Sequence, residues 1–109
     1  MLTLLYPQQD YTSAEIALKI QSLVASEGKK IYTVPKHFGR NETSVEKNLS
    51  QSNPVVFLAY DTAVIDPQTK SELEYLKGKS KEVIAVIPKD FLLDPALVSK
   101  SFTYQRGNK

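Results

Sequence analysis

The stretch "NPVVFLAYDTAVIDPQTKSELEYLKGKSKEVIAVIP", residues 53–88, indicates the fold class of this chain of 109 residues. It contains two strand-like runs, at 55–60 and 82–88, whose interiors are continuously apolar. Such strands are covered on both faces, as in a parallel sheet. The segment between them begins with an Asp66-Pro67 pair, which suits an N-cap and a first helical position, and it ends at Gly78. This strand–helix–strand unit predicts an α/β fold.

Helix and strand patterns continue on both sides of this unit. Further strands are expected at residues 2–6, 30–34 and 102–105. Further helices are expected from a Thr12–Glu15 capping box to Gly28, from a Thr43–Glu46 capping box, and from Asp94-Pro95. We therefore predict one domain over residues 1–109, with a three-layer, doubly wound α/β fold. Its mostly parallel sheet of four or five strands is expected to have the flavodoxin-like order 2-1-3-4-5.

The composition excludes several classes of protein. Fourteen basic residues are interspersed with twelve acidic ones, so nucleic-acid binding is not indicated. The absence of cysteine excludes disulfides and thiolate metal sites and fits a cytoplasmic protein. A single histidine, His37, excludes a multi-histidine site, and no metal site is predicted. No apolar stretch approaches the roughly 18 residues that span a bilayer, so no membrane association is expected.

The predicted ligand edge lies beyond the carboxyl ends of strands 1 and 3, where this fold binds ligands. It holds Tyr6, Asp61 and a loop with His37 and Arg40, which are our candidate nucleotide contacts. Arg40 could bind a phosphate or carboxylate bidentately, although solvent exposure is the simpler expectation for both loop residues. No G-x-G-x-x-G, G-x-x-x-x-G-K or G-x-S-x-G motif is present, so the usual phosphate cradle and nucleophile elbow are missing.

Two glutamates occupy the helix between residues 66 and 78. Taking Leu73 and Leu76 as the core-facing pair, Glu72 lies about 70° and Glu74 about 130° from the middle of that stripe. Glu74 should face solvent, whereas Glu72 should lie between core and water near the strand ends. A carboxylate at a cleft edge can bind ribose hydroxyls or act on a leaving group. Alternatively, Thr69 and Glu72 form a capping box and Glu72 is only structural.

Residues 44–88, "SVEKNLSQSNPVVFLAYDTAVIDPQTKSELEYLKGKSKEVIAVIP", resemble the central part of Toll/interleukin receptor (TIR) domains. The shared features are a helix ending in serine, an apolar strand, an "EL" pair in the next helix, a lysine-rich turn and a strand of the "vIpV" type. The resemblance implies that Glu72 is the catalytic residue of NAD⁺ cleavage and contacts the nicotinamide ribose. NAD⁺ would then be a substrate, no resident cofactor is predicted, and the loop at 35–43 would cover the site.

Three functions remain open. The first is a TIR-like enzyme or NAD-type nucleotide sensor that uses Glu72. The second is a non-catalytic TIR-like signalling domain that self-associates or binds a protein through helix and loop surfaces. Its candidate apolar patch comprises Phe38, Phe91, Leu92 and Leu93, although "FLLDP" is more typical of a core plug. The third is a nucleotide-processing protein similar to nucleoside deoxyribosyltransferases. Both enzyme hypotheses require a cleft that exposes Glu72 beside Tyr6 and Asp61.

Overall fold

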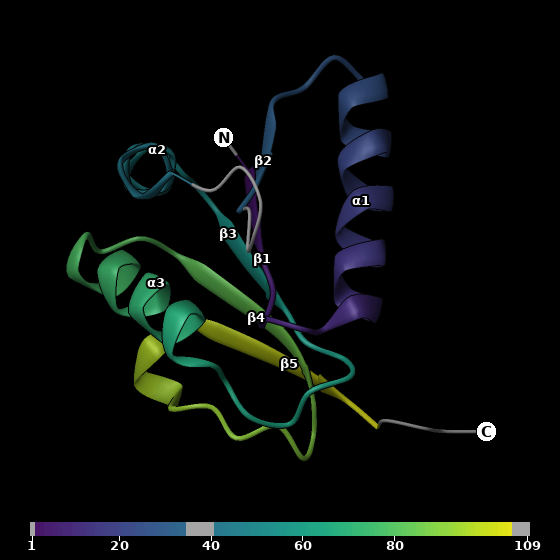
Figure 1. The fold of residues 1–109 in the computed structure, drawn as a ribbon, viewed down its shortest axis with the longest axis vertical. Coiled ribbons are helices and arrows are strands. Elements are labelled where there is room, and N and C mark those ends of the chain that lie inside the picture. Colours follow the sequence, from purple (N-terminus) through teal and green to yellow (C-terminus); the bar gives the residue numbers. More distant parts are fainter. Residues whose placement is uncertain (1, 35–40, 106–109) are drawn as a thin grey trace.

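The computed structural model describes residues 2–34 and 41–105, whose arrangement is shown in Figure 1. Strands and helices alternate along the chain, as predicted. The elements are β1 (Leu2–Leu5), α1 (Tyr11–Ser26), β2 (Ile31–Thr33), α2 (Glu42–Ser50), β3 (Val55–Leu58), α3 (Pro67–Gly78), β4 (Val83–Pro88), the short 3₁₀ helix η1 (Pro95–Leu97) and β5 (Lys100–Tyr104). No helix within the described ranges is long and apolar enough to cross a membrane.

The five strands form one parallel sheet in the order β2-β1-β3-β4-β5, which confirms the predicted flavodoxin-like order. α1 packs on one face of the sheet, and α2 and α3 pack on the other, so the fold has three layers (Figure 1). β3 lies in the centre of the sheet, where Val56 is paired with Leu4 of β1 and with Ile84 of β4. This central position explains why its sequence shows no polar alternation.

The two sides of the sheet carry cores of different size. On the side of α2 and α3, a large cluster surrounds Phe57 and includes Val45, Leu49, Leu73 and Leu76 from the two helices. On the side of α1, the buried cluster of described residues comprises Leu4, Ala17 and Leu58. Strand register places Val86 and Phe102 side by side on this second face, yet Phe102 is 56% exposed. The half of this face formed by β4 and β5 is therefore less covered than the half beneath α1.

Two predicted helix starts were wrong. α1 begins one residue before Thr12, because the Asp10 carboxylate accepts the Ser13 N–H at 3.1 Å and takes the N-cap position. α2 begins at Glu42, because Asn41 accepts the Ser44 N–H at 2.9 Å. Asx side chains are at least as good as threonine at this position, so the earlier residue caps the helix in both cases.

The start of α3 was predicted correctly. Asp66 caps it by accepting the Thr69 N–H at 3.0 Å, and Pro67 is the first helical residue. The alternative capping box at Thr69 and Glu72 is wrong, because Thr69 lies inside the helix and its hydroxyl donates to Asp66. β5 begins at Lys100, two residues before the predicted strand. The helix expected from Asp94-Pro95 is the single 3₁₀ turn η1.

Candidate functional site

A cavity of about 270 Å³ lies between α2 and α3, on the side of the sheet opposite α1. Four residues of each helix line it at the same spacing, i, i+3, i+4 and i+7, which places each set on one helical face. The lining residues are Glu42, Val45, Glu46 and Leu49 from α2 and Gln68, Ser71, Glu72 and Tyr75 from α3. Val45 and Leu49 also belong to the main core, so the cavity has an apolar base. We call it the α2–α3 pocket.

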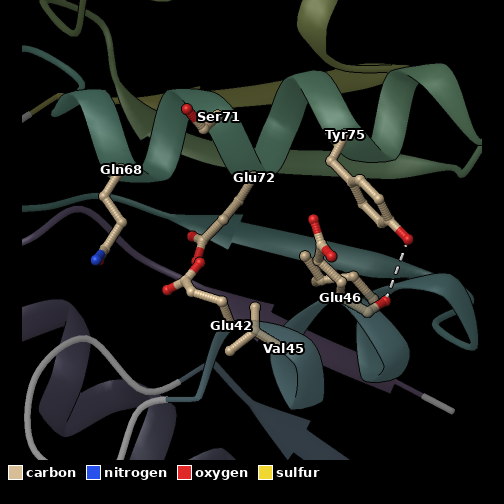
Figure 2. A pocket seen from close by; sticks show the side chains of 8 residues that line it. Glu42, Val45, Glu46, Gln68, Ser71, Glu72 and Tyr75 are labelled. Atoms are coloured by element: carbon tan, nitrogen blue, oxygen red, sulfur yellow. Dashed lines mark hydrogen bonds between the residues drawn. The ribbon is translucent and has the colours of Figure 1, made fainter.

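Glu72 is the most buried acidic side chain of this pocket, with 5% of its surface exposed. Its neighbours Leu73 and Leu76 are fully buried, whereas Glu74 is exposed as predicted. Figure 2 shows the carboxyl group of Glu72 pointing toward that of Glu42 across the space between the two helices. Two facing carboxyl groups concentrate negative charge and acceptor oxygens. Hydroxyl donors and cationic groups are therefore the ligands that this end of the pocket favours.

The far end of the pocket is closed by a link between the helices. The Tyr75 hydroxyl on α3 donates a hydrogen bond to the Glu46 carbonyl on α2, at 3.4 Å (Figure 2). The side-chain carboxyl of Glu46 projects from α2 toward α3. Three carboxyl groups, two polar side chains and one aromatic ring therefore line a single cavity.

At the crevice formed by the ends of β1 and β3, the chain itself supplies hydrogen-bond donors to the buried acceptor. Asp10 is 1% exposed, and it accepts the N–H groups of Tyr60 at 2.8 Å and Asp61 at 3.1 Å. It also accepts the Thr62 N–H at 3.3 Å and the Thr62 hydroxyl at 3.1 Å. The bonds from residues 60–62 tie the β1–α1 loop to the loop after β3, and a further bond from Ser13 caps α1.

These contacts determine the charge state of Asp10. Burial raises the pKa of its carboxyl group, but the N–H donors of Tyr60, Asp61 and Ser13 outweigh burial. The pKa therefore lies below its ordinary value, and Asp10 is held as a carboxylate.

Asp61 makes the reciprocal contact from the loop after β3. Its carboxylate accepts the Thr12 N–H at 2.7 Å and the Thr12 hydroxyl at 2.8 Å. The first turn of a helix is where this fold class commonly binds a phosphate. Here Asp10 and Asp61 supply the anionic groups at the first turn of α1. The β1/β3 crevice is therefore closed by internal contacts.

Those candidate residues that the structure describes do not meet in one cleft. Tyr6 packs against the smaller core on the α1 side, where burial raises the pKa of its hydroxyl. Asp61 binds the start of α1, and neither residue lines the pocket that contains Glu72. His37 and Arg40 lie outside the described residues. The cleft that was expected to expose Glu72 beside Tyr6 and Asp61 is therefore not formed by the described residues; Glu72 is 5% exposed and lines a pocket between α2 and α3 instead.

The apolar patch expected at residues 91–93 does not form as a unit. Phe91 is 6% exposed and packs edge-on against Phe57, with ring centroids 5.7 Å apart. Leu93 also packs against the main core, whereas Leu92 is 69% exposed. The segment is therefore the core plug that its sequence suggested, and Phe38 lies outside the described residues.

Glu42 and Glu46 were not identified from the sequence. The available signal was their spacing relative to Val45 and Leu49, because each glutamate lies three residues before one of these apolar positions and so shares its helical face. Within residues 2–34 and 41–105, no three metal-binding side chains are placed to hold a metal ion. Comparison of the chain with protein-family models, curated proteins and solved structures finds no match. The fold and the pocket therefore carry the functional argument.

Proposed function

We propose that this chain is a TIR-like, nucleotide-sensing domain that binds a ribose in the α2–α3 pocket and cleaves NAD⁺ with Glu72 as the catalytic residue. The observation that carries the proposal is the position of Glu72, which is nearly buried, lines a cavity and faces Glu42. The proposal therefore places the ligand against α2 and α3 and not beside Tyr6 and Asp61, as the sequence had suggested. The resemblance of residues 44–88 to TIR domains names the same residue independently of this geometry. The three-layer fold with strand order 2-1-3-4-5 is consistent with both.

The chemistry of the pocket suits cleavage of a nicotinamide riboside bond. In this reaction nicotinamide leaves with the electron pair of the C1′–N1 bond, and positive charge develops on the ribose. A carboxylate beside the ribose accepts its hydroxyl hydrogens and stabilises that charge. Water then adds to C1′ and loses a proton, giving ADP-ribose and nicotinamide. Glu72 would accept the hydrogens of the ribose hydroxyls and stabilise the positive charge on the ribose, and Glu42 would add to the negative potential.

The size and charge of the pocket define the orientation of the ligand. Its volume of about 270 Å³ is slightly below the range typical of sites for whole small-molecule ligands, so it suits one half of a dinucleotide. The three carboxyl groups disfavour a pyrophosphate inside the cavity. We therefore place the cationic nicotinamide riboside end inside and the pyrophosphate and adenosine outside.

The same negative lining favours a second candidate function. A nucleoside without phosphate avoids repulsion altogether, as expected for a protein similar to nucleoside deoxyribosyltransferases. In that reaction a glutamate such as Glu72 attacks C1′ of the deoxyribose, and the base leaves with the electron pair of the glycosidic bond and takes up a proton. An acceptor base or water then displaces Glu72 from C1′. A deoxynucleoside substrate separates the two functions.

The test is release of nicotinamide from NAD⁺ by concentrated purified protein, followed by liquid chromatography. We expect Glu72→Gln to reduce the rate by at least about 100-fold. Glu74→Gln is the matched control, because Glu74 lies on the same helix but is exposed, and it should retain the wild-type rate. Release of base from a deoxynucleoside, without release of nicotinamide, would favour the second function. No release from either substrate would contradict catalysis and leave the non-catalytic signalling domain.

A further inference from the structure

β5 is an open edge of the sheet. It lies last in the strand order, and among the described residues its strand partner is β4 alone. Residues 100–103 are exposed, whereas the strand at the opposite edge, β2, is only three residues long and half-buried. Exposed edge strands are usually protected by proline, by several charges or by a bulge. β5 reads "KSFTY", with no proline and one charged residue, at its first position.

The backbone groups of β5 that face outward can be assigned. Lys89 donates its N–H to the Tyr104 carbonyl at 2.8 Å, so the polar backbone groups of Tyr104 face β4. Backbone direction alternates along a strand, so Phe102 also faces β4. Ser101 and Thr103 therefore direct their N–H and carbonyl groups toward the open edge.

We propose that two copies of this chain form a dimer by antiparallel pairing of β5 with β5, about a two-fold axis at Phe102. This register is the one that pairs all five residues of the strand. Ser101 of one copy and Thr103 of the other exchange backbone N–H···O bonds. The two Phe102 residues meet as a non-hydrogen-bonded pair, whose Cα atoms are about 4.5 Å apart.

The sequence of β5 is complementary to itself in this register. Phe102 is opposite Phe102 of the second copy, and an aromatic pair stabilises neighbouring strands. Lys100 is opposite Tyr104 of the second copy, so the two lysines do not face each other and each lies near an aromatic ring. Ser101 is opposite Thr103 on the other face, where both hydroxyls can form hydrogen bonds. No like charges are opposed.

A pair of five-residue strands is a small interface, so the dimer should be concentration-dependent and form in the micromolar range. Because no residue of β5 lines the α2–α3 pocket, the inference does not rest on the proposed function. The resulting ten-stranded sheet places α1 of both copies on one face and both pockets on the other.

The test is sedimentation velocity of the purified chain over a series of micromolar concentrations. We expect the wild type to shift from monomer to dimer. Phe102→Lys should be a monomer throughout, because it opposes two ammonium groups at the two-fold axis. Thr103→Pro should also be a monomer, because it removes an outward N–H that the monomer does not need. Phe102→Tyr, which keeps the aromatic pair, should remain a dimer.

Leu18→Lys is the control for general apolar self-association, because Leu18 is 61% exposed on α1, away from β5. It should dimerise like the wild type. Circular dichroism establishes that each variant is folded. A wild type that stays monomeric at the highest concentration would overturn the proposal. A dimer that survives Phe102→Lys and Thr103→Pro, or one that Leu18→Lys dissociates, would also overturn it, and the latter would assign the contact to α1.

Discussion

Asp10 and Glu72 are both nearly buried carboxyl groups, but Asp10 caps α1, whereas Glu72 belongs to α3 on the opposite face of the sheet. Asp10 accepts hydrogen bonds from four residues of its own chain and closes the crevice at the ends of β1 and β3. Glu72 lines a cavity and faces another carboxyl group. Burial alone therefore does not identify a functional acid. A carboxylate surrounded by backbone donors stabilises the fold, whereas one directed into a cavity among other carboxyl groups is a candidate for ligand binding.

The largest expected effect is on stability, at Asp10. Asp10→Ala removes the N-cap of α1 and leaves the N–H groups of residues 60–62 without their acceptor. We expect a loss of about 3 kcal/mol in the free energy of unfolding. Urea denaturation measures it, with Glu74→Ala as a control that should stay within about 0.5 kcal/mol of the wild type. A loss below about 1 kcal/mol would show that the crevice is not held by Asp10.

The pH dependence of stability also tests the contribution of the Asp10 carboxylate. The pKa of Asp10 is lower in the folded chain than in the unfolded chain, so its stabilising effect is fully present above the unfolded value of about 4. That stabilisation is lost as the pH falls through the folded value. Urea midpoints measured from neutral to acid pH should therefore fall less steeply for Asp10→Asn than for the wild type. Parallel curves for the two proteins would contradict the assigned role of the carboxylate.

A smaller effect is expected at Asp61, the other carboxylate of the crevice. Its side chain is exposed, and it accepts two hydrogen bonds from Thr12. Water can replace the lost acceptor, so Asp61→Ala should cost only about 0.5–1 kcal/mol in urea denaturation. A cost as large as that of Asp10→Ala would mean that the two carboxylates act as one unit.

The smallest effect on stability, and one of opposite sign, is expected at Glu72. Glu72→Gln keeps the shape of the side chain but removes one of two facing negative charges. Residues of functional sites are often suboptimal for stability, so the variant should be unchanged or more stable by up to about 1 kcal/mol. Comparison of the thermal unfolding midpoints of Glu72→Gln and the wild type tests this expectation. A clear destabilisation would make Glu72 a structural residue comparable to Asp10.

The sequence predicted those features that depend on neighbouring residues. The apolar run 55–60 and the Asp66-Pro67 pair identified a buried strand and the start of α3, and together with the flanking elements they led to the strand order. The start of α1 was missed because Thr12–Glu15 matches a capping box although Asp10 is as good an N-cap residue, and the contacts that favour Asp10 come from residues 60–62, about fifty positions away. Glu42 and Glu46 were missed because only the packing of α2 beside α3 shows which residues share the cavity with Glu72.

The most direct test of the comparison is an NMR titration of the ¹⁵N-labelled chain with NAD⁺. Binding in the α2–α3 pocket predicts shift changes at the amides of Gln68, Ser71, Glu72 and Tyr75, and these changes should be absent or much weaker in Glu72→Gln. The amide chemical shifts of Asp10, Thr12 and Asp61 should not change, because their crevice is closed by its own carboxylates. Changes concentrated at Asp10, Thr12 and Asp61, with α3 unaffected, would contradict the assignment of the pocket as the ligand site.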